Sequence, residues 1–227
     1  EWLPDDLLHH IATENNISEV AFIKENDAGF DIRWFNRSGE EILCGHGTLA
    51  ASHIIDTYLR KNPGEPISFS TKFYGQISVL PLGNSSYQLD LPKISCEYID
   101  PKSFAFYHGV SSKPKNIYKG IDYLLEYESE SQLRMIHIES DIIENIDARG
   151  VVITAPSDDF DFISRCFYPK SFIQEDPVTG SAHCMLVPFW SNKFDKKELT
   201  CMQYSSYLNR FGIIKSKQKK DRVILIG

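Results

Sequence analysis

The chain has 227 residues, of which 42% are hydrophobic and 24% charged, so it is long enough to bury a core and differs from disordered chains. Its net charge of −7 argues against a nucleic-acid-binding protein, which needs a concentrated basic face. The one basic run, residues 215–220, precedes a strand-like segment and is typical of a solvated hairpin tip. No apolar stretch approaches the roughly 20 residues that cross a bilayer, and no signal peptide is visible, so we expect no membrane association.

The cysteines indicate a reducing compartment. Their odd number and the lack of a C-x-x-C pair suit neither a disulfide framework nor a zinc site, so we expect free thiols in a cytoplasmic protein. The chain contains no ligand-spaced Cys/His cluster and no nucleotide-binding glycine motif, so we expect it to need neither a metal nor a cofactor. The five residues are Cys44, Cys96, Cys166, Cys184 and Cys201.

The first half of the chain predicts helices and short strands in an irregular order. Pro4, Asp5 and Asp6 suit the first turn of a helix that ends at Asn15 and Asn16. A helix is expected over residues 45–60, and its residues 48–60 carry apolar side chains around most of the circumference, so we expect it to be buried nearly all round. The expected strands cover residues 20–23, 30–34, 67–70, 76–80 and 87–91.

The second half repeats this composition after a domain boundary that we place between residues 97 and 98. The predicted domains are therefore 1–97 and 98–227. A second apolar helix is expected over residues 180–191, and its residues His183 and Cys184 are expected to pack inside the fold. The other predicted elements are strands over 122–128, 151–155, 164–168 and 223–226 and a helix over 131–136. Because strands and helices do not alternate regularly, we predict an α+β fold.

Two segments share one pattern at one spacing: residues 41–47 (EILCGHG) and residues 176–182 (DPVTGSA). Each has an acid, two spacers, Cys or Thr, and a glycine, and each opens an apolar helix. The first N–H groups of a helix have no partner inside it and carry the positive end of its dipole. Two such ends that face one cleft would bind an anion or stabilise an enolate. Two unrelated helix caps are the alternative interpretation.

These segments also resemble the paired signatures of the phenazine-biosynthesis (PhzF-like) isomerase family. The matching residues are Arg33-Trp34-Phe35, Glu40, residues 44–48 and residues 176–182, and residues 15–19 match a third family segment. The resemblance implies a diaminopimelate-epimerase fold of two pseudo-symmetric domains, each a curled sheet around a central helix. It also implies that the chain lacks a first and a last strand that family members usually have.

The resemblance further implies a role for individual residues. The general acid/base glutamate of the family falls on Glu19, its Gly-His histidine on His46, and its second-motif acid on Asp176. The alternative interpretation of Glu19 is a surface glutamate, and that of His46 and Asp176 is a polar residue at the start of a helix. At a helix N-terminus we expect His46 to be neutral, and we expect Glu40 and Glu41 at an exposed strand end. The substrate-binding residues implied by the two motifs are Gly45, Gly47, Thr48, Thr179, Gly180, Ser181 and Ala182.

The leading hypothesis is a cofactor-independent isomerase that moves a proton on a small carboxylate-bearing metabolite by general acid/base catalysis. One alternative is an amino-acid racemase or epimerase with a cysteine at each helix N-terminus. Cys44 occupies the first such position, but Thr179 occupies the second, and a hydroxyl is far too weak an acid for that role. The other alternative is a non-catalytic protein that binds small anions. Relatives in the family suggest a homodimer.

Overall fold

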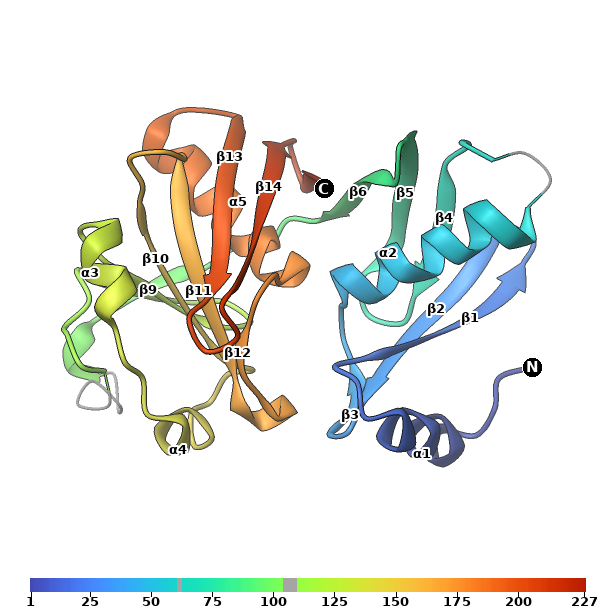
Figure 1. The fold of residues 1–227 in the computed structure, drawn as a ribbon, viewed down its shortest axis with the longest axis horizontal. Coiled ribbons are helices and arrows are strands. Elements are labelled where there is room, and N and C mark those ends of the chain that lie inside the picture. Colours follow the sequence, from blue (N-terminus) through green and yellow to red (C-terminus); the bar gives the residue numbers. More distant parts are fainter. Residues whose placement is uncertain (61–62, 104–109) are drawn as a thin grey trace.

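The computed structural model describes residues 1–60, 63–103 and 110–227, and it has the α+β architecture expected from the sequence. Two lobes lie side by side, with the N-terminal half of the chain in one and most of the C-terminal half in the other (Figure 1). The first lobe contains α1 (Asp5–Asn15), β1 (Val20–Asn26), β2 (Gly29–Asn36), β3 (Gly39–Glu41), α2 (Gly45–Ile54), the π-helical turn η1 (Ile55–Leu59), β4 (Ile67–Thr71), β5 (Gly75–Gly83) and β6 (Ser86–Pro92).

The second lobe is larger and contains a long central helix. Its elements are β7 (Glu97–Ile99), η2 (Pro101–Ser103), β8 (Asn116–Lys119), β9 (Tyr123–Glu126), α3 (Glu130–Met135), α4 (Ser140–Ile143), β10 (Val151–Pro156), β11 (Phe162–Tyr168), η3 (Pro169–Ser171), β12 (Ile173–Asp176), α5 (Gly180–Phe194), β13 (Glu198–Ser205), β14 (Arg210–Gln218) and β15 (Arg222–Ile226).

One continuous sheet runs through both lobes in the order β1-β2-β4-β5-β6-β15-β14-β13-β11-β10-β9-β8-β7. Its pairs are antiparallel except for β2 with β4, β9 with β10 and β11 with β13. The last strand, β15, pairs with both β14 and β6, so the end of the chain returns to the sheet of the first lobe. The division into domains 1–97 and 98–227 stays a prediction, because this strand joins the two halves.

The two central helices differ in how far they are covered. In α5, ten of the fifteen residues are buried, and Trp190 and Met185 belong to the main hydrophobic core. In α2, only five of the ten residues are buried. Ile54 in α2 is 46% exposed, and Tyr58 in the following turn is 72% exposed. The expectation that residues 48–60 are buried nearly all round was therefore wrong, because the sheet of the first lobe packs against one side of α2 only.

Several other expectations are confirmed and a few strands were missed. α1 begins directly after Pro4, and the basic run of residues 215–220 extends from the end of β14 across the turn before β15. The sequence did not predict β8, β13 or most of β14. All five cysteines are free thiols. Within the described ranges, the structure has no helix that is long and apolar enough to cross a membrane.

Candidate active site

The N-termini of α2 and α5 meet where the two lobes touch. Cys44 and Thr179 occupy the N-cap positions in similar extended conformations, with φ/ψ of −130°/110° and −116°/99°. A Cβ atom added to Gly45 would lie 2.9 Å from the Cα atom of Gly180, so only glycine fits at this contact. The predicted juxtaposition of two helix N-termini is therefore confirmed. The sequence pattern shared by residues 41–47 and 176–182 corresponds to two similar structures, each a loop that leads into the start of a helix.

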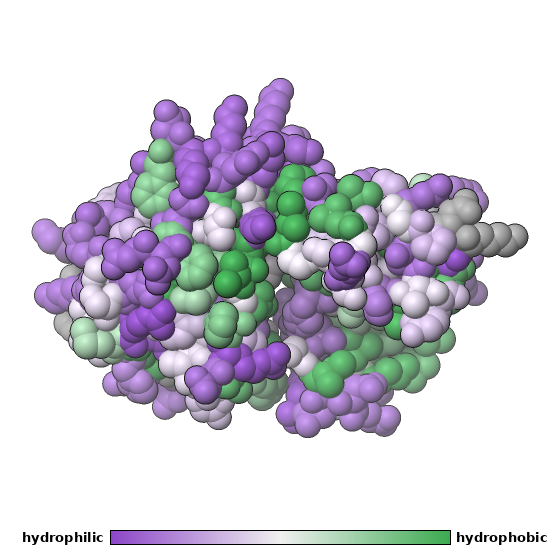
Figure 2. All heavy atoms as spheres, turned by 45° about the horizontal axis from the view of Figure 1, so that its top comes forward, coloured by the Kyte–Doolittle hydropathy of each residue, from purple (hydrophilic) through white to green (hydrophobic). Residues whose placement is uncertain are grey.

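A narrow cavity lies beside this contact and takes its walls from both lobes. In Figure 2 the two lobes touch across the middle of the face, with a hollow between them lower in the view. The first lobe contributes Glu19, which lies just before β1, and residues between 41 and 46. The second lobe contributes Arg149, which lies just before β10, and residues from the end of β11 to the first turn of α5. The cavity is lined by Glu19, Glu41, Leu43, Cys44, Gly45, His46, Arg149, Tyr168, Ser171, Ile173, Asp176, Thr179, Gly180 and Ser181.

On the wall of the first lobe, Glu19, Cys44 and His46 form one cluster. The Glu19 Oε2 atom lies 3.0 Å from His46 Nε2, and the Cys44 Sγ atom lies 3.9 Å from His46 Nδ1. The Glu19 side chain is 11% exposed, whereas the His46 side chain is 48% exposed. Cys44 Sγ also accepts a hydrogen bond from the Gly47 N–H at 3.3 Å, so the thiol caps α2. One donor atom from each of the three residues lies within 4.8 Å of the others, which is close enough to share a metal ion.

The surroundings of His46 oppose the neutral state that was expected for it. Its contact with Cys44 and its ion pair with Glu19 raise the pKa of His46 well above the usual 6.5. Burial raises the pKa of Cys44, which keeps this residue a neutral thiol, so Glu19 is the partner that stabilises the imidazolium. The neutral state of His46 stays a prediction, because the helix dipole favours it whereas the carboxylate 3.0 Å away favours the imidazolium.

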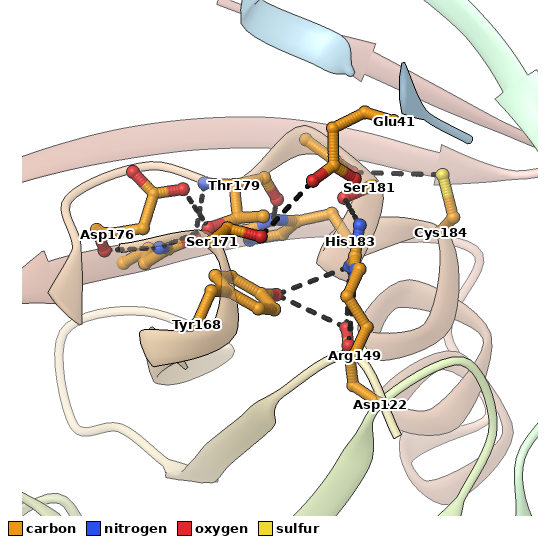
Figure 3. A network of polar contacts seen from close by, with 12 residues as sticks. Glu41, Asp122, Arg149, Tyr168, Ser171, Asp176, Thr179, Ser181, His183 and Cys184 are labelled. Atoms are coloured by element: carbon orange, nitrogen blue, oxygen red, sulfur yellow. Dashed lines mark hydrogen bonds and ion pairs between the residues drawn. The ribbon is translucent and has the colours of Figure 1, made fainter. Parts of the chain in front are cut away.

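On the opposite wall, Asp176 is held by its neighbours in the loop before α5 (Figure 3). Thr179 Oγ1 donates a hydrogen bond to the Asp176 carboxylate. Gln203 of β13 accepts the Thr179 N–H at 2.8 Å and donates to the Asp176 carbonyl oxygen at 2.8 Å. Burial raises the pKa of Asp176, against the opposing effect of the Thr179 hydrogen bond. Gln203 is a positioning residue that the sequence analysis did not find.

A second network, also missed from the sequence, centres on Arg149 (Figure 3). Its guanidinium donates to both Asp122 oxygens, at 3.0 and 2.7 Å, and to Ser181 Oγ at 2.9 Å. The Tyr168 ring lies against the same guanidinium, with 4.8 Å between the ring centroid and Cζ. Asp122 is fully buried and neutralises the charge of Arg149. The ion pair therefore places a guanidinium at the cavity wall but adds no net charge there. This network fixes Ser181, which the sequence analysis had assigned to substrate binding.

Not every predicted binding residue lines the cavity. Gly45, Thr179, Gly180 and Ser181 do, as do the predicted catalytic residues Glu19, His46 and Asp176. Gly47, Thr48 and Ala182 are buried behind this wall. The Thr48 N–H and Oγ1 both donate to the Cys44 carbonyl oxygen, at 3.2 and 2.6 Å. The binding roles of these three residues stay predictions, and the observed hydrogen bonds of Gly47 and Thr48 belong to the cap of α2.

Glu40 and Glu41 do not lie at an exposed strand end, as had been expected. Glu40 is 14% exposed and forms an ion pair with Arg33 at 2.6 Å. Glu41 lines the cavity, accepts a hydrogen bond from Asn36 at 2.6 Å, and accepts another from Ser171 of the opposite lobe at 3.2 Å. Glu41 and Asp176 occupy the same position in the two similar segments, and this correspondence could have identified Glu41 as a cavity residue.

Comparisons with known proteins place this chain among similar sequences and structures. The profile of a family described as "Phenazine biosynthesis-like protein" matches residues 2–227. An uncharacterized isomerase of Halalkalibacterium halodurans is 37% identical over 227 residues, which cover 98% of this chain and 84% of that protein. The crystal structure of a PhzF family phenazine biosynthesis protein from Enterococcus faecalis superposes with a TM-score of 0.86 at 33% identity, over 100% of this chain and 85% of that one.

A more distant likeness concerns the fold alone. A hydroxyproline epimerase from Agrobacterium vitis, 9% identical, superposes with a TM-score of 0.63 over 97% of this chain and 74% of that one. The α+β, diaminopimelate-epimerase-like fold predicted from the sequence is therefore confirmed.

Proposed function

The chain belongs to the phenazine biosynthesis-like (PhzF) family and is an isomerase, and we propose that it moves a proton between two carbon atoms of a small carboxylate-bearing metabolite without a cofactor. The observation that carries the proposal is the placement of Glu19, His46 and Asp176 on the walls of one cavity at two facing helix N-termini. A proton shift on carbon needs a base, an acid and stabilisation of the anion formed between the two steps.

Glu19 is the proposed base. Its carboxylate is nearly buried at the cavity wall, and His46 pairs with it from the more exposed side at 3.0 Å. This ion pair orients the carboxylate, and it supplies a charged hydrogen-bond donor next to the reacting carbon. Glu19 takes the proton from the first carbon and becomes a carboxyl group, which exchanges its proton with solvent. It then protonates a second carbon of the same molecule, so the carboxylate is regenerated within one turnover.

The second lobe supplies a proposed hydrogen-bond donor to the substrate and the anion site. Burial raises the pKa of Asp176, which favours its protonated form, and Thr179 holds its side chain in place. The N–H groups of Gly45 and Gly180 open the two helices at the cavity, where the positive ends of both dipoles favour a carboxylate or an enolate. These groups support a negatively charged substrate even though three acidic side chains line the same cavity.

The two-cysteine racemase alternative finds less support at the same site. Thr179 occupies the position of the second cysteine, and its hydroxyl is already bound to Asp176. Cys44 is 4% exposed and burial raises its pKa, so it is a poor thiolate base. A non-catalytic anion-binding protein would have no need for the ion pair of Glu19 with His46.

The experiment is a screen for hydrogen exchange at carbon. The protein is incubated in deuterium oxide with a panel of small carboxylic acids whose C–H bonds are acidified by a neighbouring carbonyl group or double bond, and NMR follows each mixture. We expect one class to give a positional isomer with deuterium at the new carbon, at an undiminished rate in excess EDTA. Turnover that stops on chelation would refute the cofactor-independent mechanism, and inversion without positional isomerisation would favour the racemase.

A further inference from the structure

The cluster of Glu19, Cys44 and His46 has the composition and geometry of a metal-binding site. It combines a carboxylate oxygen, a thiol sulfur and an imidazole nitrogen, which are the donor types found in zinc proteins. The donor atoms all lie within 4.8 Å of one another. Glu19 Oε2 lies 3.0 Å from His46 Nε2, and Cys44 Sγ lies 3.9 Å from His46 Nδ1 and 4.0 Å from His46 Nε2. The site could not be predicted from the sequence, because Glu19 is distant in the chain from Cys44 and His46.

The separations are close to those that a tetrahedral ion imposes. With metal–ligand bonds of about 2.0–2.3 Å, the donor atoms of a tetrahedral zinc site lie roughly 3.3–3.6 Å apart. The separations of 3.0 and 4.0 Å bracket this range, and the remaining one, between Glu19 and Cys44, is at most 4.8 Å, so side-chain rotations would bring all three atoms onto one ion. Cys44 is fixed by the start of α2, whereas His46 is 48% exposed and is free to adjust.

The surroundings also favour a cation. Glu19 Oε2 is buried and, beyond its ion pair with His46, accepts no hydrogen bond within the described part of the chain. Glu41 and Asp176 line the same cavity, while the charge of Arg149 is neutralised by Asp122. The open side of His46 leaves a path for an ion and a fourth position for water or for an anion.

We propose that this cluster binds one zinc-like divalent cation through Glu19, Cys44 and His46, and that the bound ion blocks the cavity. On binding, the Cys44 thiol and the protonated His46 ring each release a proton to solvent, and the three side chains displace three water ligands of the ion. The ion occupies the carboxylate that the proposed proton transfer needs, so it acts as an inhibitor of that reaction. Metal binding itself does not depend on the proposed function.

The test uses Co²⁺ as a spectroscopic probe of the intact chain under anaerobic, reducing conditions. We expect one equivalent of Co²⁺ to give a thiolate-to-cobalt charge-transfer band in the near ultraviolet, together with the intense visible bands of a tetrahedral site. Added Zn²⁺ should remove these bands by displacement. A wild-type protein that shows no charge-transfer band would overturn the proposal.

Variants identify the ligands. Cys44→Ser should abolish the charge-transfer band, and His46→Gln should weaken Co²⁺ binding by at least about tenfold. Cys96→Ser is the matched control, because Cys96 is a half-buried thiol that lies outside the cluster, and it should leave the band unchanged. A band that survives Cys44→Ser, or one that disappears with Cys96→Ser, would place the ion elsewhere. Circular dichroism confirms that each variant is folded.

The proposed inhibition by the bound ion is tested separately, by measuring turnover. Once the exchange screen has supplied a substrate, one equivalent of Zn²⁺ should stop its turnover in the wild type, and EDTA should restore it. Turnover that persists with Zn²⁺ bound would refute the inhibition. A chain that binds Co²⁺ as described but turns over no acid in the panel would refute the proposed function and leave the metal site in place.

Discussion

Gly180 is the residue at which the two helix N-termini come closest. A Cβ atom there would lie 3.0 Å from the Gly45 Cα atom, which is backbone and cannot rotate away. Gly180→Ala should therefore push the helix ends apart and lower the free energy of unfolding by about 1–3 kcal/mol, a usual cost of overpacking. Urea denaturation measures this change. Gly227→Ala is the control, because its Cβ would have open space, and a loss no larger than the control's would contradict the close contact.

His183 is a buried histidine that should make stability depend on pH. It is fully buried in α5, and its Nδ1 donates a hydrogen bond to the Thr179 carbonyl oxygen at 2.8 Å. Burial lowers the pKa of His183 to about 4, against the opposing effect of that hydrogen bond. Because the unfolded chain binds the proton more readily, stability is complete above pH 6.5 and falls as the pH drops from there towards 4.

The loss expected from His183 between pH 7 and pH 5 is about 2 kcal/mol in the free energy of unfolding. Urea denaturation at the two pH values measures it. His183→Gln should reduce the difference between the two pH values by that amount, whereas His10→Gln, at an exposed position, should not. A wild type whose pH dependence equals that of His183→Gln would show that this histidine is not held neutral.

At the scale of elements, the strand β12 is anchored by a buried ion pair. Arg165 of β11 and Glu175 of β12 are 5% and 3% exposed, and Nε lies 2.5 Å from Oε1. Arg165 also donates to the Ile136 carbonyl oxygen at 2.7 Å, and Glu175 accepts the Tyr207 N–H at 2.9 Å. The pair thus links β12 to the segment after α3 and to the turn after β13. Asp176 is the next residue along the chain, so this anchor also positions the site.

Glu175→Gln should destabilise the fold by about 3–5 kcal/mol, because it leaves the Arg165 charge buried without a counter-ion. Chemical denaturation measures this effect. The control is Glu198→Gln, which breaks an exposed ion pair with Lys217 and should leave stability unchanged within error. Equal stability of the two variants would refute the anchoring role.

The two central helices show what a sequence pattern can and cannot predict. The acid-x-x-Cys/Thr-Gly pattern, which occurs twice, predicted both helix starts correctly, because N-caps and glycines are local signals. The coverage of each helix is not local. α2 and α5 are both rich in apolar residues, yet Ile54 is 46% exposed because strands lie against only one side of α2. Strands such as β13 were missed because their burial depends on neighbours that are distant in sequence.

At the scale of the whole molecule, the site exists only where the lobes meet. Glu19 and His46 come from one lobe and Asp176 from the other, and the family resemblance supplied all three. Arg149 could not be found in this way. It lies 27 residues from Asp122 and 32 from Ser181, and it meets Asp122 because the parallel pairing of β9 with β10 brings the residues before both strands together.

The central claim, that Glu19 transfers the proton, is tested most directly by deuterium incorporation from solvent in two variants. With a substrate from the exchange screen, Glu19→Gln should lower the exchange rate about 10²–10⁴-fold while the fold and the affinity for ligand stay nearly intact, because an amide keeps the shape but cannot take a proton. Cys44→Ser should have a mild effect by comparison, since serine can also cap α2. Loss of exchange in Cys44→Ser with normal exchange in Glu19→Gln would contradict the account and support the racemase instead.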